Sequence, residues 1–333
     1  MTLLSRCYHR RVKSGDVSVR LIPAIVGPTA SGKSEMGLQI ALSLSGEIVN
    51  LDSVQVYRGI YVATAKVPLA ERRGVPHHLI DIAEPAENFT AGEYARVAAR
   101  TITEIETRKH TAVLVGGTGF YLRALMNPLF EGPETNAALR DRLIALRDSR
   151  GAEHLHQILK RVDAQAAKTI SPRDWARTMR ALEVYFQTGR RMSEVRTDAP
   201  PAPELAQRIR VVALNPPRDE LYSRINARAE RMFAGGLIEE VESLIATGVP
   251  ESAKAFGAHG YRRVVEYLKG KRSREDALNQ MKLDTRHYAK RQLSWWRSWP
   301  GVKWINGFGD EAGAFEEAIE YLRTSAGGDP ALG

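Results

Sequence analysis

The chain has 333 residues, enough for one large domain or two smaller ones, and its composition is ordinary for a globular protein. Its one cysteine, Cys7, excludes an internal disulfide framework and a cysteine-rich zinc site, and no apolar run is long enough to cross a membrane. The formal net charge of +9 favours polyanionic partners such as nucleic acid, phosphorylated substrates or an anionic membrane, and the single cysteine fits a reducing, cytoplasmic compartment.

Both ends of the chain are expected to lie outside the fold. Residues 1–19 carry four Lys/Arg and one acidic residue without a secretory pattern, and we expect a disordered leader there. Residues 325–333 are expected to form a disordered tail.

The first predicted elements are a strand at 21–26, a loop and a helix from Lys33 to about residue 44. The loop reads GPTASGKS and matches G-x-x-x-x-G-K-[ST], the phosphate-binding loop (P-loop). Its glycines let backbone N–H groups close around phosphate oxygens, while Lys33 would neutralise phosphate charge and Ser34 would bind Mg²⁺. The predicted phosphate-binding residues are therefore Gly27, Pro28, Thr29, Ala30, Ser31, Gly32, Lys33 and Ser34.

Two further strands are predicted at 47–51 and 111–115, with a long helix at 91–108 between them. Strands that alternate with helices indicate an α/β fold, a P-loop NTPase-like parallel sheet with helices on both faces. Ligands of such sheets bind at the carboxyl ends of the strands. Asp52 and the GGTG turn at 116–119 follow two of these strands, so we expect them near the loop.

The position of Asp52 argues against a nucleotide hydrolase. Such an enzyme usually places an acidic residue at the end of a buried strand to hold Mg²⁺, but the strand at 111–115 ends in two glycines. Asp52 is predicted instead to be a general base that takes a proton from an acceptor. Two other roles stay open for it: orienting the ligands of a metal, or capping a helix N-terminus.

The second half of the chain begins with helical periodicity and no strand over residues 131–197. A proline-rich linker at 199–203 precedes a strand at 208–214, helices at 218–233, 237–246 and 274–299, and a last short strand at 304–306. We therefore predict a split core domain, residues 20–130 and 198–324, with a helical insertion at 131–197.

Seven segments in register resemble the tRNA dimethylallyltransferases, the tRNA isopentenyltransferases of the IPP transferase family. They are GPTASGKS, LDSVQVYRGIYVATAK, VPHHLIDI, LVGGTGFYLRALM, RALEVYFQTGRRMSE, GYRRVVEYLKG and TRHYAKRQLSWWR, and the resemblance spans roughly residues 21–305. The resemblance implies that the loop holds dimethylallyl diphosphate rather than ATP. The dimethylallyl group would move to N6 of adenosine 37 in tRNAs that read codons beginning with U, and diphosphate would leave with Mg²⁺.

Matching positions imply further site residues. Thr29 resembles the threonine beside the reacting carbon, Thr118 the threonine near the phosphates, and Arg224 the arginine that binds the diphosphate. Asp52, as the base, would take the proton of the adenine amine. An ion pair on the helix surface is the alternative for Arg224.

The predicted tRNA contacts fall into two groups. Near the target base the resemblance implies Asp52, Ser53, Val54 and Gln55, and the amide of Gln55 could pair with the edge of adenine. The basic surfaces predict contacts to the anticodon stem-loop from Arg177, Arg180, Arg262, Arg286, Lys290 and Arg291; a solvated surface is the alternative. The family usually has Pro-Gln-Arg where this chain has Trp175-Ala176-Arg177, which leaves a glutamine contact to the tRNA without a counterpart.

Several motifs receive structural interpretations. Trp295, Trp296 and Trp299 are expected to hold the long basic helix against the core, and His77 and His78 to make hydrogen bonds rather than bind metal. We expect a monomer without a membrane contact. Two competing functions remain, a P-loop small-molecule kinase that uses ATP and a non-catalytic RNA-binding protein.

Overall fold

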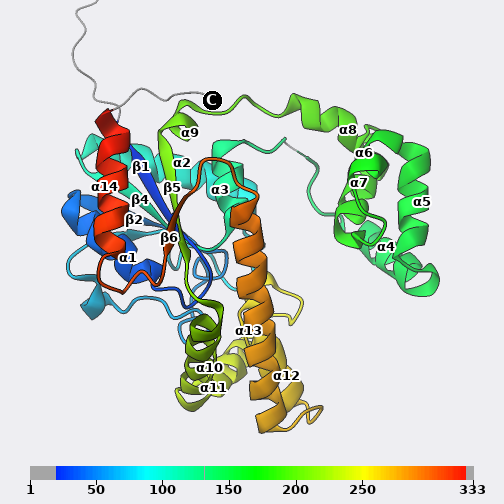
Figure 1. Cartoon of the computed structure of the whole chain (residues 1–333). Coiled ribbons are helices and arrows are strands. Elements are labelled where there is room, and N and C mark those ends of the chain that lie inside the picture. Colours follow the sequence, from blue (N-terminus) through cyan, green and yellow to red (C-terminus); the bar gives the residue numbers. More distant parts are fainter. Residues whose placement is uncertain (1–19, 131, 328–333) are drawn as a thin grey trace, which may run out of the picture.

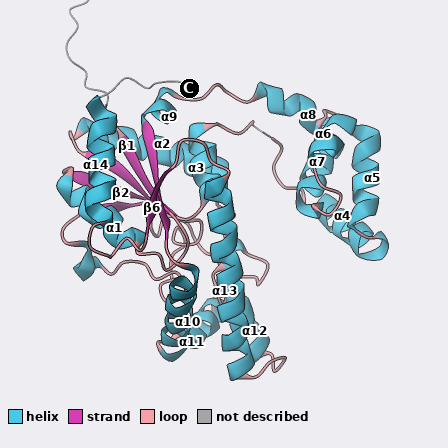
Figure 2. Cartoon of the chain, viewed as in Figure 1, coloured by secondary structure: helices cyan, strands magenta, loops and turns pink. Residues whose placement is uncertain are grey.

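The protein is described here by a computed structural model that covers residues 20–130 and 132–327. A parallel six-stranded sheet of order β3-β2-β4-β1-β5-β6 forms its centre (Figures 1 and 2). The strands are β1 (Ile22–Val26), β2 (Gly46–Leu51), β3 (His77–His78), β4 (Thr111–Gly116), β5 (Ile209–Asn215) and β6 (Lys303–Asn306). The predicted α/β fold with its parallel sheet is confirmed. The predicted leader, residues 1–19, lies outside the described residues.

Helices cover both faces of the sheet because the central strands are apolar on both sides. Along β4, Ala112 and Leu114 belong to one core cluster, whereas Val113 and Val115 belong to the other. The helices around the sheet are α1 (Lys33–Ser43), α2 (Ala91–Thr107), α3 (Gly119–Met126), α9 (Glu204–Arg208), α10 (Arg218–Ala234), α11 (Leu237–Ala246), α12 (Tyr261–Leu268), α13 (Arg274–Arg297) and α14 (Ala314–Gly327), with short 3-10 helices at Leu69–Arg72, Arg196–Asp198 and Lys254–Gly257. None of the helices in the described ranges has the length and apolarity to span a membrane.

Five helices of the middle of the chain pack around a core of their own. They are α4 (Ala137–Arg150), α5 (Ala152–Val162), α6 (Ala164–Thr169), α7 (Trp175–Thr188) and α8 (Met192–Val195). Their buried side chains, among them Leu155, Leu159 and Leu182, form a cluster separate from those of the sheet. Figure 1 shows this bundle set apart from the sheet, joined to it by two extended connections.

The C-terminal helix α14 differs from the expectation for the tail. Residues 325–327 were predicted to be disordered, but they complete α14, and the hydroxyl of Ser325 donates to the carbonyl of Tyr321 at 2.7 Å. The helix forms because Ala314, Ala318 and Leu322 share one face, which packs on the sheet cluster that includes α1. The rest of the predicted tail, 328–333, lies outside the described residues.

The buried carboxylate of Glu47, near the start of β2, joins β2 by hydrogen bonds to β3 and to the residues just before β4. Glu47 is 2% exposed and accepts hydrogen bonds from Arg108 at 2.8 and 3.1 Å, from His78 at 2.6 Å and from His110 at 2.7 Å. Burial alone would raise the pKa of Glu47, but the hydrogen bonds from Arg108, His78 and His110 outweigh it and lower the pKa to about 2. The hydrogen-bonding role expected for His78 is therefore confirmed.

Replacing Glu47 should destabilise the fold in a pH-dependent way. We expect Glu47→Gln to lower the free energy of unfolding at neutral pH by about 2 kcal/mol, because Arg108 and the histidines lose a charged acceptor. The unfolded pKa is the ordinary 4.5 and the folded pKa is about 2, so the wild-type advantage is complete above pH 4.5 and vanishes as pH falls toward 2. Urea unfolding across this range measures it. Glu104→Gln, at an exposed position of α2, is the control, and an equal loss there would contradict the prediction.

Candidate functional site

The P-loop joins β1 to α1 in a conformation that needs glycine at its end. Gly32 caps α1 with φ 81°, and a Cβ atom there would lie 2.6 Å from a carboxylate oxygen of Asp310. The carbonyl of Ser31 accepts a hydrogen bond from the backbone N–H of Gly309 at 2.8 Å. The loop is therefore supported from outside by the segment that follows β6, far away in the sequence.

A cavity at the carboxyl ends of the strands brings together residues from both halves of the chain. It contains the predicted residues Thr29, Lys33, Ser34, Asp52, Val54 and Gln55 and adds Asn50, Ala63, Thr64, His77, Gly116, Arg228, His259, Tyr288 and Gln292. A second cavity on the outer side of the P-loop shares Lys33, Ser34, Val67 and Arg228 with it. These four shared residues thus stand between the two cavities.

The charges in the first cavity influence each other. Burial, helped by the neighbouring Arg228 guanidinium, lowers the pKa of Lys33 to about 8, while the carboxylate of Asp52 acts in the opposite direction. The ammonium of Lys33 donates to the carbonyl of Pro28 at 3.0 Å, and Arg228 reaches the hydroxyl of Thr29 at 3.5 Å. Two confined cations with one carboxylate make this cavity suitable for an anion.

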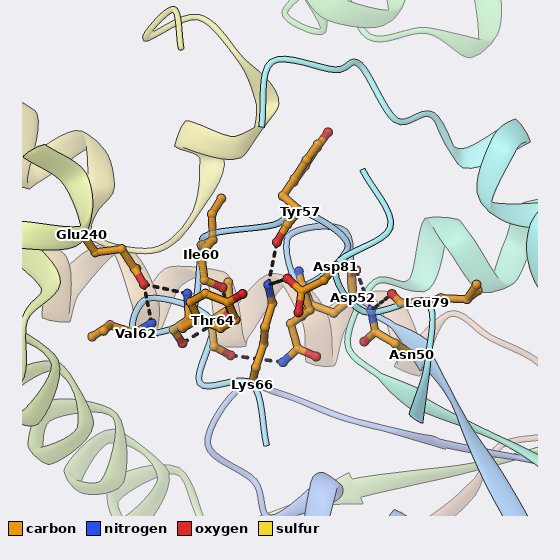
Figure 3. Close-up of polar contacts among 12 residues, drawn as sticks. Asn50, Asp52, Tyr57, Ile60, Val62, Thr64, Lys66, Leu79, Asp81 and Glu240 are labelled. Atoms are coloured by element: carbon orange, nitrogen blue, oxygen red, sulfur yellow. Dashed lines mark hydrogen bonds and ion pairs between the residues drawn. The ribbon is translucent and has the colours of Figure 1, made fainter. Parts of the chain in front are cut away.

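Asp52 is held by the turn that follows β2. Its Oδ1 atom accepts the backbone N–H groups of Val54 at 2.8 Å and Gln55 at 3.2 Å, and the residues after it form turns rather than a helix. Asn50 ties this turn to the segment after β3, since its amide donates to the carbonyls of Asp52 at 3.3 Å and Leu79 at 3.0 Å (Figure 3). Among the described residues no hydrogen bond engages Oδ2 of Asp52, so one carboxylate oxygen stays available for a ligand. The alternative of a helix cap is therefore wrong.

The GGTG turn at 116–119 is joined by hydrogen bonds to the turn that carries Asp52 and, through Gln292, to the P-loop. The hydroxyl of Thr118 accepts the N–H of Ser53 at 3.0 Å, so Thr118 lies beside Asp52 without lining the cavity. Gln292 of α13 is 5% exposed, and its amide accepts the N–H of Thr29 at 2.9 Å and donates to the carbonyl of Gly117 at 3.1 Å. This one side chain fixes the spacing between the P-loop and the turn.

The end of β4 has no room for an acidic side chain. A Cβ atom at Gly116 would lie 2.2 Å from the carbonyl oxygen of Leu51 on β2. Only glycine fits where these two neighbouring parallel strands lie so close, and the position where nucleotide hydrolases usually carry a metal-binding acid is therefore closed.

Two arginines one turn apart on α10 have different surroundings. Arg224 makes an ion pair with Asp310 at 2.7 Å, and its guanidinium lies 3.6 Å from the centre of the Phe308 ring, in the outer cavity. Arg228, which the sequence analysis did not select, lines both cavities. The spacing of four residues was the available signal, because it puts both arginines on one face of a helix.

Other residues of the cavity were also missed. His259 contacts the ring of Tyr288 with 4.3 Å between centroids, and burial lowers the pKa of His259 to about 4, so it is neutral at neutral pH. Burial also raises the pKa of Tyr288, which keeps its proton. Gln292 had no local sequence signal at all, since its role depends on how α13 crosses the sheet.

The predicted RNA-contacting residues lie on three surfaces. Arg177 and Arg180 belong to α7 of the bundle, where Arg177 is 66% exposed and Arg180 donates to the carbonyl of Pro133. Lys290 and Arg291 are exposed on α13, whereas Arg286 donates to Asn226 of α10 at 3.1 Å. Arg262, 81% exposed, begins α12.

Trp295 and Trp296 at the end of α13 and Trp299 just after it have the predicted structural role. Trp296 is fully buried in the main core cluster, and Trp295 and Trp299 pack against that cluster. The helix that carries Gln292 is therefore anchored to the core just beyond the site.

Comparisons with known proteins agree with one another. A family model described as IPP transferase matches residues 55–299. The tRNA dimethylallyltransferase of Solibacter usitatus is 46% identical over 299 residues, which cover 90% of this chain and 97% of that protein; that of Koribacter versatilis is 43% identical over 305 residues, which cover 92% and 99%.

Solved structures of transferases that act on tRNA have a similar fold. A tRNA isopentenylpyrophosphate transferase from Bacillus halodurans superimposes with a TM-score of 0.67 at 36% identity, covering 92% of this chain and 96% of that one. A eukaryotic dimethylallyltransferase acting on tRNA superimposes with a TM-score of 0.75 at 26% identity, covering 92% of this chain and 80% of that one.

The lowered pKa of Lys33 predicts how anion binding depends on pH. Inorganic diphosphate should bind most tightly while Lys33 is protonated, so its affinity should decline as pH rises through about 8. Titration calorimetry measures this decline. Lys33→Met should bind more weakly and follow only the titration of the ligand itself. Parallel pH profiles for the two proteins would show that Lys33 does not set the dependence.

Proposed function

The chain belongs to the IPP transferase family, and we propose that it is a tRNA dimethylallyltransferase. It would transfer the dimethylallyl group of dimethylallyl diphosphate to N6 of adenosine 37, in tRNAs that read codons beginning with U, giving N6-dimethylallyladenosine and diphosphate. The observation that carries the proposal is the single cavity in which Lys33 and Arg228 stand beside Asp52.

The cavity supports a direct displacement. A bond forms between the adenine N6 atom and C1 of the dimethylallyl group, the bond from C1 to the diphosphate oxygen breaks, and the N6 proton passes to Asp52. Negative charge grows on the departing oxygen, where Lys33, Arg228 and the N–H groups of the P-loop would stabilise it. We assign Thr29 to the neighbourhood of the reacting carbon, because its hydroxyl lies 3.5 Å from Arg228, and Thr118 to the positioning of Ser53.

The chemistry of the site fits Mg²⁺. Ser34 lines both cavities, and its hydroxyl would join phosphate oxygens and water as hard oxygen ligands. The described residues hold no cluster of three metal-ligating side chains, so the substrate would have to supply most of the ligands. Bound there, the ion would neutralise charge on the diphosphate.

The separate helical bundle supports a role in RNA binding. We propose that residues 131–197 form an insertion that contacts the anticodon stem-loop through Arg177 and Arg180, inside a core formed by 20–130 and 198–324. Lys290, Arg291 and Arg262 would contact phosphates, while Gln55 would meet the target base. Arg286 would contribute less, because Asn226 already binds it. Since one chain supplies every group of the cavity, we propose a monomer, acting in the cytoplasm.

The kinase alternative is not favoured. A kinase of this fold also needs a carboxylate to receive a proton, but it binds ATP and usually holds its Mg²⁺ with an acid at the end of a buried strand. Gly116 closes the usual place for the metal-binding acid, and the matching relatives are named as transferases acting on tRNA.

A transfer assay tests the proposal. We expect label from dimethylallyl diphosphate to enter an anticodon stem-loop with adenosines at 36 and 37 when Mg²⁺ is present. Asp52→Asn should lower kcat at least about 100-fold, since the amide keeps the turn but cannot take the proton. Labelled ATP is the parallel donor. ATP turnover without RNA labelling would refute the transferase and favour the kinase.

A second prediction distinguishes the two arginines of α10. Arg228→Ala should lower kcat/KM for dimethylallyl diphosphate by about 100-fold, because a cation at the leaving group is lost. Arg224→Ala should have a smaller effect, since Asp310 already neutralises Arg224. Steady-state kinetics of the two variants gives the comparison, and the reverse order would assign the diphosphate contact to Arg224.

A further inference from the structure

Part of the cavity wall is a short segment, residues 60–66, that is held by hydrogen bonds from two other parts of the chain (Figure 3). Ala63 and Thr64 line the cavity, but Tyr61 is 55% exposed and the segment belongs to no helix or strand. A segment of this kind keeps its shape only through specific contacts.

The first anchor is Glu240 of α11. One of its carboxylate oxygens accepts the backbone N–H groups of Tyr61 at 2.6 Å and Val62 at 2.7 Å. The other oxygen accepts the N–H of Ala63 at 3.1 Å and the hydroxyl of Tyr261 at 2.7 Å. Three successive N–H groups on one carboxylate are charge-assisted hydrogen bonds, which are stronger than neutral ones.

The second anchor is Lys66, at the other end of the segment. Its buried ammonium donates to the carbonyl of Tyr57 at 2.5 Å and to the carboxylate of Asp81 at 2.6 Å. The residue between the anchors, Thr64, is further tied by its hydroxyl to the carbonyl of Ile60 at 2.9 Å.

The carbonyl oxygen of Thr64 connects the segment with the reaction. It accepts the side-chain amide of Gln55 at 3.1 Å and the guanidinium of Arg228 at 3.4 Å. Gln55 lies on the side of the cavity that we assign to the base, and Arg228 on the side that we assign to the diphosphate. One backbone atom therefore sets the positions of both.

We propose that Glu240 is a positioning residue for the transfer: by holding the N–H groups of Tyr61–Ala63, it places the Thr64 carbonyl that orients Arg228 and Gln55. Glu240 itself is not among the residues that line the cavity. The inference rests on the proposed function, because it assumes that these two side chains hold the diphosphate and the base.

Glu240→Ala tests the proposal, with Glu239→Ala as the matched control on an exposed position of the same helix. The hydrogen bonds of Glu240 hold one surface segment and lie outside the sheet, so the variant should still fold, and its melting temperature is compared with that of the control. We expect kcat/KM for dimethylallyl diphosphate to fall about 10- to 100-fold, as small misplacements of reacting groups cost this much. The KM for the stem-loop RNA should change less, because only Gln55 near the target base is displaced while the basic surfaces are intact.

Two further variants separate positioning from general destabilisation. Glu240→Gln keeps one carbonyl oxygen for Tyr61 and Val62 and should recover part of the activity. Tyr261→Phe removes one hydrogen bond to the carboxylate but none to the segment, so its effect should be smaller than that of Glu240→Ala. Equal kcat/KM in Glu240→Ala and the control, with active wild type, would overturn the inference and leave the proposed function standing.

Amide hydrogen exchange of the full chain gives a readout that needs no activity. In Glu240→Ala the N–H groups of Tyr61, Val62 and Ala63 should exchange faster, while those of the sheet keep their protection. Unchanged exchange at these three positions overturns the inference whatever the transfer assay gives. Absence of transfer by the wild type, by contrast, overturns the proposed function and the inference with it.

Discussion

The confinement of two cations, Lys33 and Arg228, in one cavity is the constraint around which the site is arranged. Burial, helped by the nearby guanidinium of Arg228, lowers the pKa of Lys33, and burial also lowers the pKa of Arg228. Without an anion the cations depend on weak acceptors, the carbonyls of Pro28 and Thr64, and on the charge of Asp52. An anionic ligand would relieve this repulsion, so part of its binding energy is already stored in the folded protein.

The parts that hold these cations come from distant regions of the sequence. Arg228 is carried by α10 and Gln292 by α13, both after the helical bundle, whereas the P-loop and Asp52 come before it. The packing of α13 matters most, because Trp296 anchors it in the core while Gln292 bridges Thr29 and Gly117. The bundle between the two halves therefore does not interrupt the contacts that build the cavity.

Short sequence patterns predict those parts of the site that are formed by residues close together in the sequence. The P-loop and Asp52 follow from a strand, a glycine-rich turn and a helix, each visible within a dozen residues. The choice between Arg224 and Arg228 was beyond such patterns, since only the fold puts Asp310 beside Arg224. Gln292 and Glu240 were missed for the same reason: an amide and a carboxylate on helices look like surface residues until the loop they hold is placed against them.

The close approach of two neighbouring strands limits where this site can carry an acidic side chain. At Gly116 the backbone of β4 lies so near to Leu51 of β2 that a Cβ atom would be 2.2 Å from the carbonyl oxygen of Leu51. The last residue of β4 therefore cannot be the acid with which nucleotide hydrolases usually hold a metal. The carboxylate stands instead after β2, with one oxygen fixed by the N–H groups of Val54 and Gln55. This placement supports the proposed role of Asp52 as a base, because the carboxylate lines the same cavity as Lys33 but lies outside the usual position of a metal-binding acid.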